Sequence, residues 1–80
     1  MKRVYAMRRI GTAKMRYEEA TSPGIAAAIA MTKETKETGM SGRWQVFKTS
    51  FTPKHWEKEK NTYMNIYVKT AQKMFEEESL

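Results

Sequence analysis

Apolar and polar residues alternate along the first part of the chain, which predicts a β-hairpin. Its strands, Arg3–Ile10 and Ala13–Glu19, flank Gly11-Thr12. Glycine at the first position of a two-residue loop favours a type II′ turn, and this turn sets the register of the strands. The expected cross-strand pairs are Ile10 with Ala13, Arg8 with Met15, Ala6 with Tyr17 and Val4 with Glu19.

This register divides the hairpin into an apolar face and a basic face. The apolar face is interrupted only by Arg8 and carries Val4, Ala6, Ile10, Ala13, Met15 and Tyr17. The basic face carries Tyr5, Met7, Arg9, Lys14, Arg16 and Glu18. Such a division is typical of a sheet that buries one face and leaves the other in solvent. We therefore expect the basic face to stay open.

A helix is predicted after the hairpin. Ser22 is a suitable N-cap, Pro23 suits the first helical position, and the following alanines favour a helix. Gly39 provides a left-handed stop. The face expected to be buried comprises Ile25, Ala28, Ile29 and Thr32.

The segment Arg43–Phe51 is predicted to be a strand, because it is rich in aromatic and β-branched residues. Apolar residues occur on both of its faces, so we expect an inner position in the sheet or one face used by a partner. Thr52-Pro53 then starts a second helix. An alternative makes residues 62–70 a strand. The apolar arc of the expected helix comprises Trp56, Tyr63, Met64, Tyr67, Val68, Ala71, Met74 and Phe75.

The order β-β-α-β-α predicts a small α+β domain over residues 1–80. We expect a three-stranded antiparallel sheet with both helices packed on one face. The 80 residues suffice for one domain with a modest core. No apolar run approaches the roughly 20 residues of a membrane span, and the basic N-terminus lacks the apolar stretch of a signal peptide. A chain without cysteine or signal is expected in the cytoplasm.

The residue inventory argues against catalysis. The chain has no cysteine, no aspartate and one histidine, His55, so nucleophilic triads and thiolate metal sites are excluded. Neighbouring Glu18 and Glu19 point to opposite faces of a strand and cannot share a site. The four glycines match no phosphate-binding spacing. We therefore expect a protein that is not an enzyme and needs no metal or cofactor.

The net charge of +6 is unevenly placed, because six bases and no acid occur in residues 1–16. Cations with an aromatic between them suit a polyanion, whereas Tyr, Trp, Met and Arg are enriched at the centres of protein interfaces. Both partner classes remain open on this evidence. The candidate partner-binding residues are Tyr5, Arg9, Lys14, Arg16, Trp44 and Lys48.

The segment Met15–Phe51 combines a strand, a helix that begins Ala20-Thr21-Ser22-Pro23 and continues through several alanines, Gly39, and the strand start Trp44-Gln45-Val46. This arrangement resembles that of small bacteriophage proteins that inhibit host machinery, including some anti-CRISPR proteins. The resemblance implies a stoichiometric binder that docks on a bacterial protein or nucleoprotein complex, such as a CRISPR effector. It carries over no functional residue. The basic hairpin differs from the acidic, DNA-mimicking members.

These observations predict a small, basic, non-catalytic inhibitor of the anti-CRISPR kind. It would block nucleic-acid binding or effector recruitment by its host target. The alternative is a protein that binds DNA or RNA directly through the basic hairpin. The chain is expected to be a monomer or a weak homodimer, the latter through the helix that carries Tyr63 and Tyr67.

Overall fold

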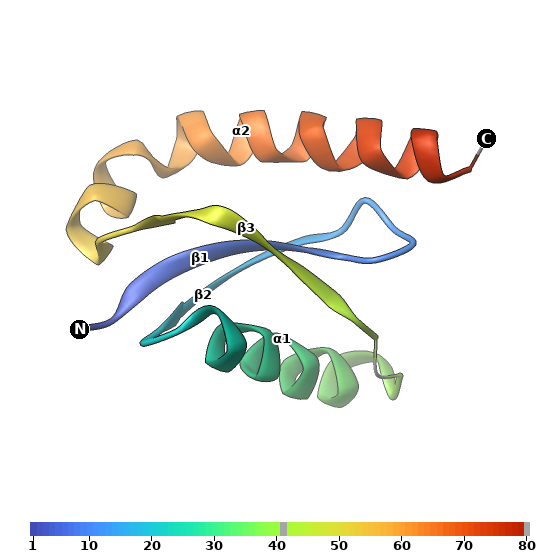
Figure 1. Ribbon diagram of the computed structural model, residues 1–80, viewed down its shortest axis with the longest axis horizontal. Helices are drawn as coiled ribbons and strands as arrows, with labels where there is room; N and C mark the ends of the chain where they lie inside the picture. The colour runs from blue at the N-terminus through green and yellow to red at the C-terminus, as the bar shows by residue number, and fades with distance from the viewer. Residues whose placement is uncertain (41, 80) are drawn as a thin grey trace.

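The computed structural model describes residues 1–40 and 42–79, and it confirms the predicted α+β class and element order (Figure 1). The elements are β1 (Arg3–Arg9), β2 (Met15–Ala20), α1 (Pro23–Thr38), β3 (Trp44–Phe51) and α2 (Pro53–Glu78). The three strands form an antiparallel sheet in the order β2-β1-β3. The central strand, β1, is also the most buried of the three.

The hairpin register is the predicted one, but the turn differs. Arg8 lies opposite Met15, and the pairs of Ala6 and Val4 are also as expected. The chain reverses over residues 9–12, where Thr12 N donates to Arg9 O at 3.1 Å. Gly11 has φ 86°, which suits the third residue of a type II turn rather than the predicted first position of a type II′ loop.

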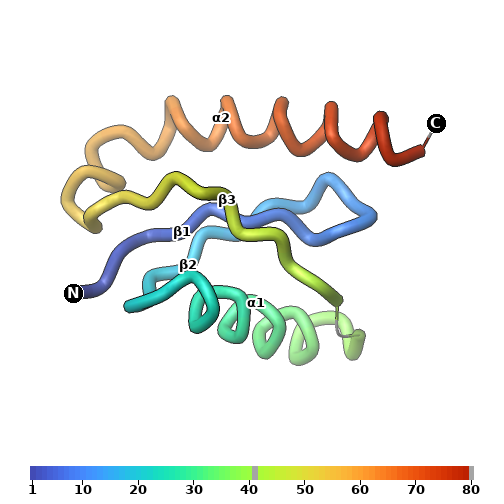
Figure 2. The backbone as a smooth tube through the Cα atoms, viewed as in Figure 1, coloured from blue at the N-terminus to red at the C-terminus, as the bar shows by residue number. Residues whose placement is uncertain are grey.

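The two helices cover opposite faces of the sheet, so the prediction that both pack on one face is wrong (Figures 1 and 2). Alternation along β1 explains the difference. Tyr5 and Met7 pack beneath α1, whereas Val4 and Ala6 pack beneath α2. Both faces of the sheet are apolar at its centre, and each requires a cover. The face expected to be open is buried under α1.

The strand β3 is an edge strand, so the predicted inner position is also wrong. Its apolar residues serve two helices: Trp44 and Val46 pack on the α1 side, and Phe47 and Phe51 pack on the α2 side. Because a helix covers each face of the sheet, even this edge strand is apolar on both faces.

The strand β3 also contains a bulge, because Tyr5 pairs with Ser50 and Met7 with Val46. Residues 47–49 therefore lie opposite the single residue Ala6.

Helix α1 begins and ends as predicted, but a different side of it is buried. Ser22 Oγ accepts from Ile25 N at 3.2 Å, and Gly39 adopts φ 73° at the C-terminal end. The buried residues are Ala26, Ala30 and Glu34. Of the predicted face, Ile29 is half-buried and packs against the core, whereas Ile25, Ala28 and Thr32 are exposed. Small alanine side chains bring the helix close to the large side chains of the sheet.

Helix α2 runs unbroken through residues 62–70, so the alternative strand is wrong. Thr52 caps it by accepting from His55 N at 3.2 Å. Its inner side joins an aromatic cluster in which Trp56 stacks on Tyr17, with 4.9 Å between the ring centroids, and Phe51 packs against Tyr63 at 4.7 Å. Within the described residues, neither helix combines the length and the apolar character that crossing a membrane requires.

Candidate partner-binding surface

The structure brings three of the predicted binding residues together around one buried carboxylate. Glu34 of α1 is only 1% exposed, although it belongs to a helix that faces solvent on its other side. Lys14 Nζ lies 2.9 Å from a Glu34 carboxylate oxygen, Arg16 Nη2 lies at 3.2 Å, and Arg9 Nη1 at 3.5 Å. The hairpin cations therefore have an anionic partner within the chain.

This environment favours the ionised form of Glu34. Its pKa is lowered mainly by the hydrogen bond from Lys14, helped by the hydrogen bond from Arg16, although burial acts in the opposite direction. A buried charge needs such partners, because an unpaired carboxylate in this position would be strongly disfavoured. Glu34 and the cations therefore stabilise the packing of α1 on the sheet.

A second set of contacts extends this network. Arg16 also pairs with Glu37, one helical turn after Glu34, and its guanidinium lies over the Trp44 ring at 5.7 Å. On the same side of the sheet, Lys33 Nζ binds the buried Glu18 at 2.8 Å. Both glutamates of α1 thus bind cations of the hairpin.

The remaining predicted binding residues are divided between the interior and the surface. Tyr5 and Trp44 are buried beneath α1. Lys48 is exposed and lies in the β3 bulge at the free edge of the sheet. A lysine and a bulge at an edge both hinder pairing with another strand, which gives Lys48 a structural role.

Sequence reasoning missed Glu34, which is not among the residues predicted to be buried on this helix, namely Ile25, Ala28, Ile29 and Thr32. A signal was present, since Ala26, Ala30 and Glu34 recur at intervals of four residues and share one face. No acid occurs in residues 1–16, which contain these cations, so an acid on the covering element was the missing partner.

Arg8, the exception on the apolar face of the hairpin, is also internally bound. It is 1% exposed and donates to Glu78 at the end of α2 at 2.7 and 3.0 Å. It also donates to Gln45 Oε1 at 3.1 Å and to Thr12 O at 2.9 Å. The hydrogen bond from Arg8 is the main cause that lowers the pKa of Glu78. Arg8 thus joins β1 to the C-terminal turn of α2.

The outer surface of α1 is the part of the molecule that looks most like a binding surface. Ile25 is 49% exposed although Ala26 beside it is fully buried. Residues spread over about three helical turns line a shallow hollow of about 410 Å³, namely Ile25, Ala28, Ile29, Thr32, Lys33 and Lys36. We call these six residues the α1 surface.

Threonine side chains make this region more apolar than its composition suggests. Thr32 Oγ1 donates to Ala28 O and Thr35 Oγ1 donates to Met31 O, each at 2.9 Å. Because both hydroxyl groups are bonded to the helix backbone, less of their hydrogen-bonding capacity faces solvent. Met31, which is also exposed, lies next to the α1 surface on the same helix.

Among the described residues, no three histidine or acidic side chains gather closely enough to hold a metal ion. His55 is exposed and packs edge-on against Phe51, with 5.5 Å between the ring centroids. The comparisons with protein-family models, curated proteins and solved structures found no match for this chain.

Proposed function

We propose that this chain is a small, non-catalytic binding protein that recognises a partner protein through the α1 surface. The observation that carries the proposal is the inverted burial of α1: Ala26 and Ala30 face the sheet, while Ile25 and Met31 remain exposed. Burying a half-exposed isoleucine costs a binding partner little and adds apolar area to the complex. A helix that existed only to cover the sheet would gain stability from the opposite arrangement.

The charges around this surface indicate the chemistry of the partner. Both glutamates of α1 bind cations of the hairpin, so the outward side retains Lys33 and Lys36 without a free acid of its own. Lys33 already binds Glu18, whereas Lys36, at the rim, belongs to no ion pair with any residue that the structure describes. An apolar partner surface bordered by acidic side chains is complementary to this arrangement.

The resemblance to phage inhibitors supports a stoichiometric mode of action within this proposal. Such a binder would occupy a site on a host protein or nucleoprotein complex, of which a CRISPR effector is one example. The α1 surface replaces the hairpin as the proposed contact region, since the hairpin cations already have an internal acid.

Direct binding of DNA or RNA is the second candidate function, and it has less support. The three cations on which it depended share Glu34, and two of its aromatic residues lie under α1. If it were correct, the chain would bind plain duplex or single-stranded DNA at low salt, and affinity would fall steeply between about 50 and 200 mM salt. We expect no such binding in fluorescence anisotropy.

The main proposal is tested by affinity capture from nuclease-treated bacterial lysate, followed by calorimetry with the captured protein. The test variant is Ile25→Glu, in which the acid falls in the first turn of α1 and suits the helix dipole. The matched control is Ile66→Glu, at a site of α2 that is 50% exposed.

We expect a partner captured at one copy per chain, retained by Ile66→Glu and weakened at least tenfold by Ile25→Glu. Equal capture by all three proteins, or no stoichiometric partner, would contradict the proposal.

A further inference from the structure

A second apolar surface lies on one side of α2, away from the aromatic cluster. Met64, Val68 and Phe75 are 38%, 41% and 41% exposed. Their spacing places them on one side of the helix over about 16 Å, next to the buried stripe that contains Tyr67 and Ala71. We call these three residues the α2 flank. It differs from the predicted dimer contact, because Tyr67 is buried against the sheet.

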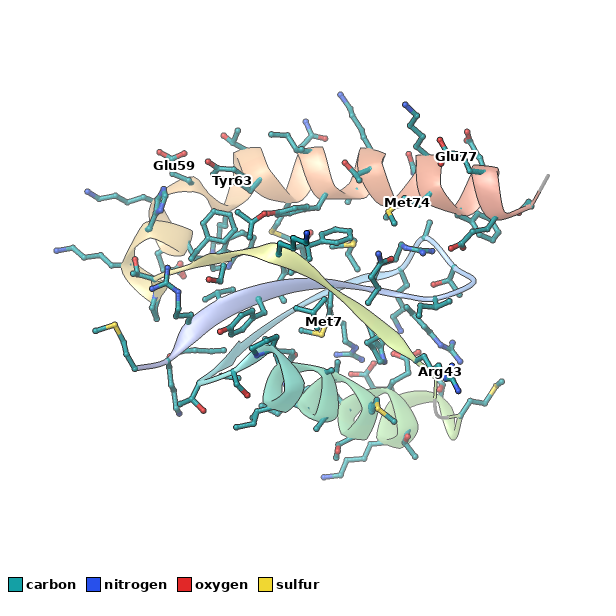
Figure 3. The ribbon with its side chains drawn as sticks, viewed as in Figure 1. Met7, Arg43, Glu59, Tyr63, Met74 and Glu77 are labelled. Atoms are coloured by element: carbon teal, nitrogen blue, oxygen red, sulfur yellow. The ribbon has the colours of Figure 1, made fainter. Side chains whose placement is uncertain are left out.

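Charged residues border the two ends of the α2 flank, but its centre is uncharged. Lys60 precedes Met64 by one helical turn and pairs with Glu57, and Glu78, which binds Arg8, follows Phe75 by three residues. Helical spacing places Asn61 beside Met64 and Gln72 beside Val68, while Lys69 and Lys73 fall on the outer side of the helix. Tyr63 and Met74 point toward the sheet, and Glu59 and Glu77 point away from it (Figure 3). A second copy could therefore approach the flank without bringing like charges together at its centre.

Among the described residues, the unpaired side chains near the N-terminal end of α2, namely Lys54, Lys58 and Glu59, carry a net positive charge, and those at its C-terminal end a negative one. Lys54 and Lys58 lie near its N-terminal end, and Glu76 and Glu77 lie near its C-terminal end. In the part of the chain that the structure describes, none of these four belongs to an ion pair. An antiparallel arrangement of two α2 helices brings each basic end beside an acidic end and opposes the helix dipoles.

We infer that a second copy of this chain packs antiparallel on the α2 flank, with the two-fold axis near Val68. In this register Met64 of each copy meets the region of Gln72 in the other, and Phe75 meets the region of Asn61, since each pair is equally spaced about Val68. Lys58 of one copy and Glu76 of the other lie 10 and 8 residues from Val68, so their levels along the paired helices differ by only about 3 Å. The contact involves one helix flank, so its area falls below the ~1,200 Å² of standard interfaces and the dimer is weak.

Dimerisation through α2 leaves the α1 surface free, because the two helices lie on opposite faces of the sheet. The dimer would present two copies of the α1 surface and could bind a repetitive partner with higher apparent affinity than one copy. The inference itself does not depend on the function of α1.

Sedimentation velocity over a range of concentrations up to about 1 mM tests the dimer. We expect the average mass to rise from 9.4 kDa toward twice that value. Val68→Glu should remain monomeric, whereas Ile66→Glu, on another side of the same helix, should associate like the original chain. A mass that stays at 9.4 kDa, or equal loss of association in both variants, would overturn the inference.

A charge exchange tests the antiparallel register even if Val68→Glu folds poorly. Lys58→Glu and Glu76→Lys should each weaken association at least threefold, since each places like charges together. The double variant restores the opposite pairing and should recover most of the affinity. Failure of the double variant to recover would refute the register, and circular dichroism spectra confirm that all variants are folded.

Discussion

At the scale of single residues, the packing of α1 depends on Glu34. The carboxylate lies between Lys14, Arg16 and Arg9, and it satisfies three cations that would otherwise repel one another. Glu37 binds only Arg16 and remains 56% exposed. The two glutamates are thus a matched pair: both contact Arg16, but one is buried and the other is in solvent.

We expect Glu34→Gln to lower the free energy of unfolding several times more than Glu37→Gln. The amide keeps the volume of the side chain but removes the charge that three cations share, whereas an exposed ion pair contributes only about 0.2–1 kcal/mol. Urea denaturation at neutral pH measures both changes. Equal effects of the two substitutions would show that the buried network adds nothing to the fold.

The carboxylates of Glu34 and Glu78 predict that the folded chain loses stability in acid. Glu34 and Glu78 have a lower pKa in the folded chain than the ordinary value of 4.5, so the unfolded chain takes up their protons first as the pH falls. Their contribution is complete above about pH 5 and is lost as the pH falls through the lowered pKa values. When the pH is lowered below about 4.5, the urea concentration at the midpoint of unfolding should decrease. It should decrease less in Glu34→Gln than in the original chain.

The raised pKa of Tyr17 predicts that the folded chain loses stability in alkali. Burial, and secondarily the charge of Tyr67, raise the pKa of Tyr17 to about 12 from 10.0. Between these values the unfolded chain loses the proton and the folded chain keeps it, so stability falls as the pH rises. Tyr17→Phe keeps the ring on Trp56 and should lose less stability between pH 10 and 12.

The hydroxyl of Tyr17 has no hydrogen-bond partner among the described residues. At pH 7, Tyr17→Phe should therefore be neutral or stabilising by up to about 1 kcal/mol in urea denaturation. Destabilisation by more than that would mean that the hydroxyl group has a partner in solution.

At the scale of elements, the two helices show which features a sequence can specify locally. The caps of both helices, the glycine stop and the hairpin register depend on neighbouring residues, and all were predicted correctly. The buried side of α1 was not, because the largest apolar residues of a helix usually face the core and here Ala26 and Ala30 do so instead. The choice depends on the large side chains of the sheet, which lie far away in the sequence.

This close packing predicts that a change in side-chain size has a large effect on the buried side of α1 and little effect on its exposed side. Ala30→Leu adds three carbons where no space remains and should destabilise the chain by about 1–3 kcal/mol. Ile25→Ala removes three carbons from an exposed site and should change stability by less than about 0.5 kcal/mol. Thermal or urea denaturation of the two variants compares them directly. A stabilising Ala30→Leu would contradict the packing described for α1.

At the scale of the whole molecule, the two helices carry no net charge of their own, and some of their acids pair with cations of the hairpin. The acids of α1 bind the hairpin cations, and the last turn of α2 binds Arg8. The α+β class and the order of the elements followed from local patterns. The arrangement in three layers, with one helix on each face of the sheet, could not be predicted in this way. Apolar residues on both faces of a strand are compatible with an inner strand as well as with a covered edge strand. The candidate site moved from the hairpin to α1 because the hairpin cations bind Glu34 within the chain.

Nuclear magnetic resonance of isoleucine methyl groups tests the proposed contact most directly. The chain has four isoleucines, of which Ile25 and Ile29 lie on the α1 surface, Ile10 follows β1 at the hairpin turn, and Ile66 lies on α2. On titration with the captured partner, the methyl signals of Ile25 and Ile29 should shift or broaden, while that of Ile10 stays unchanged. A response of Ile10 with unchanged signals from Ile25 and Ile29 would contradict the account and return the binding site to the hairpin.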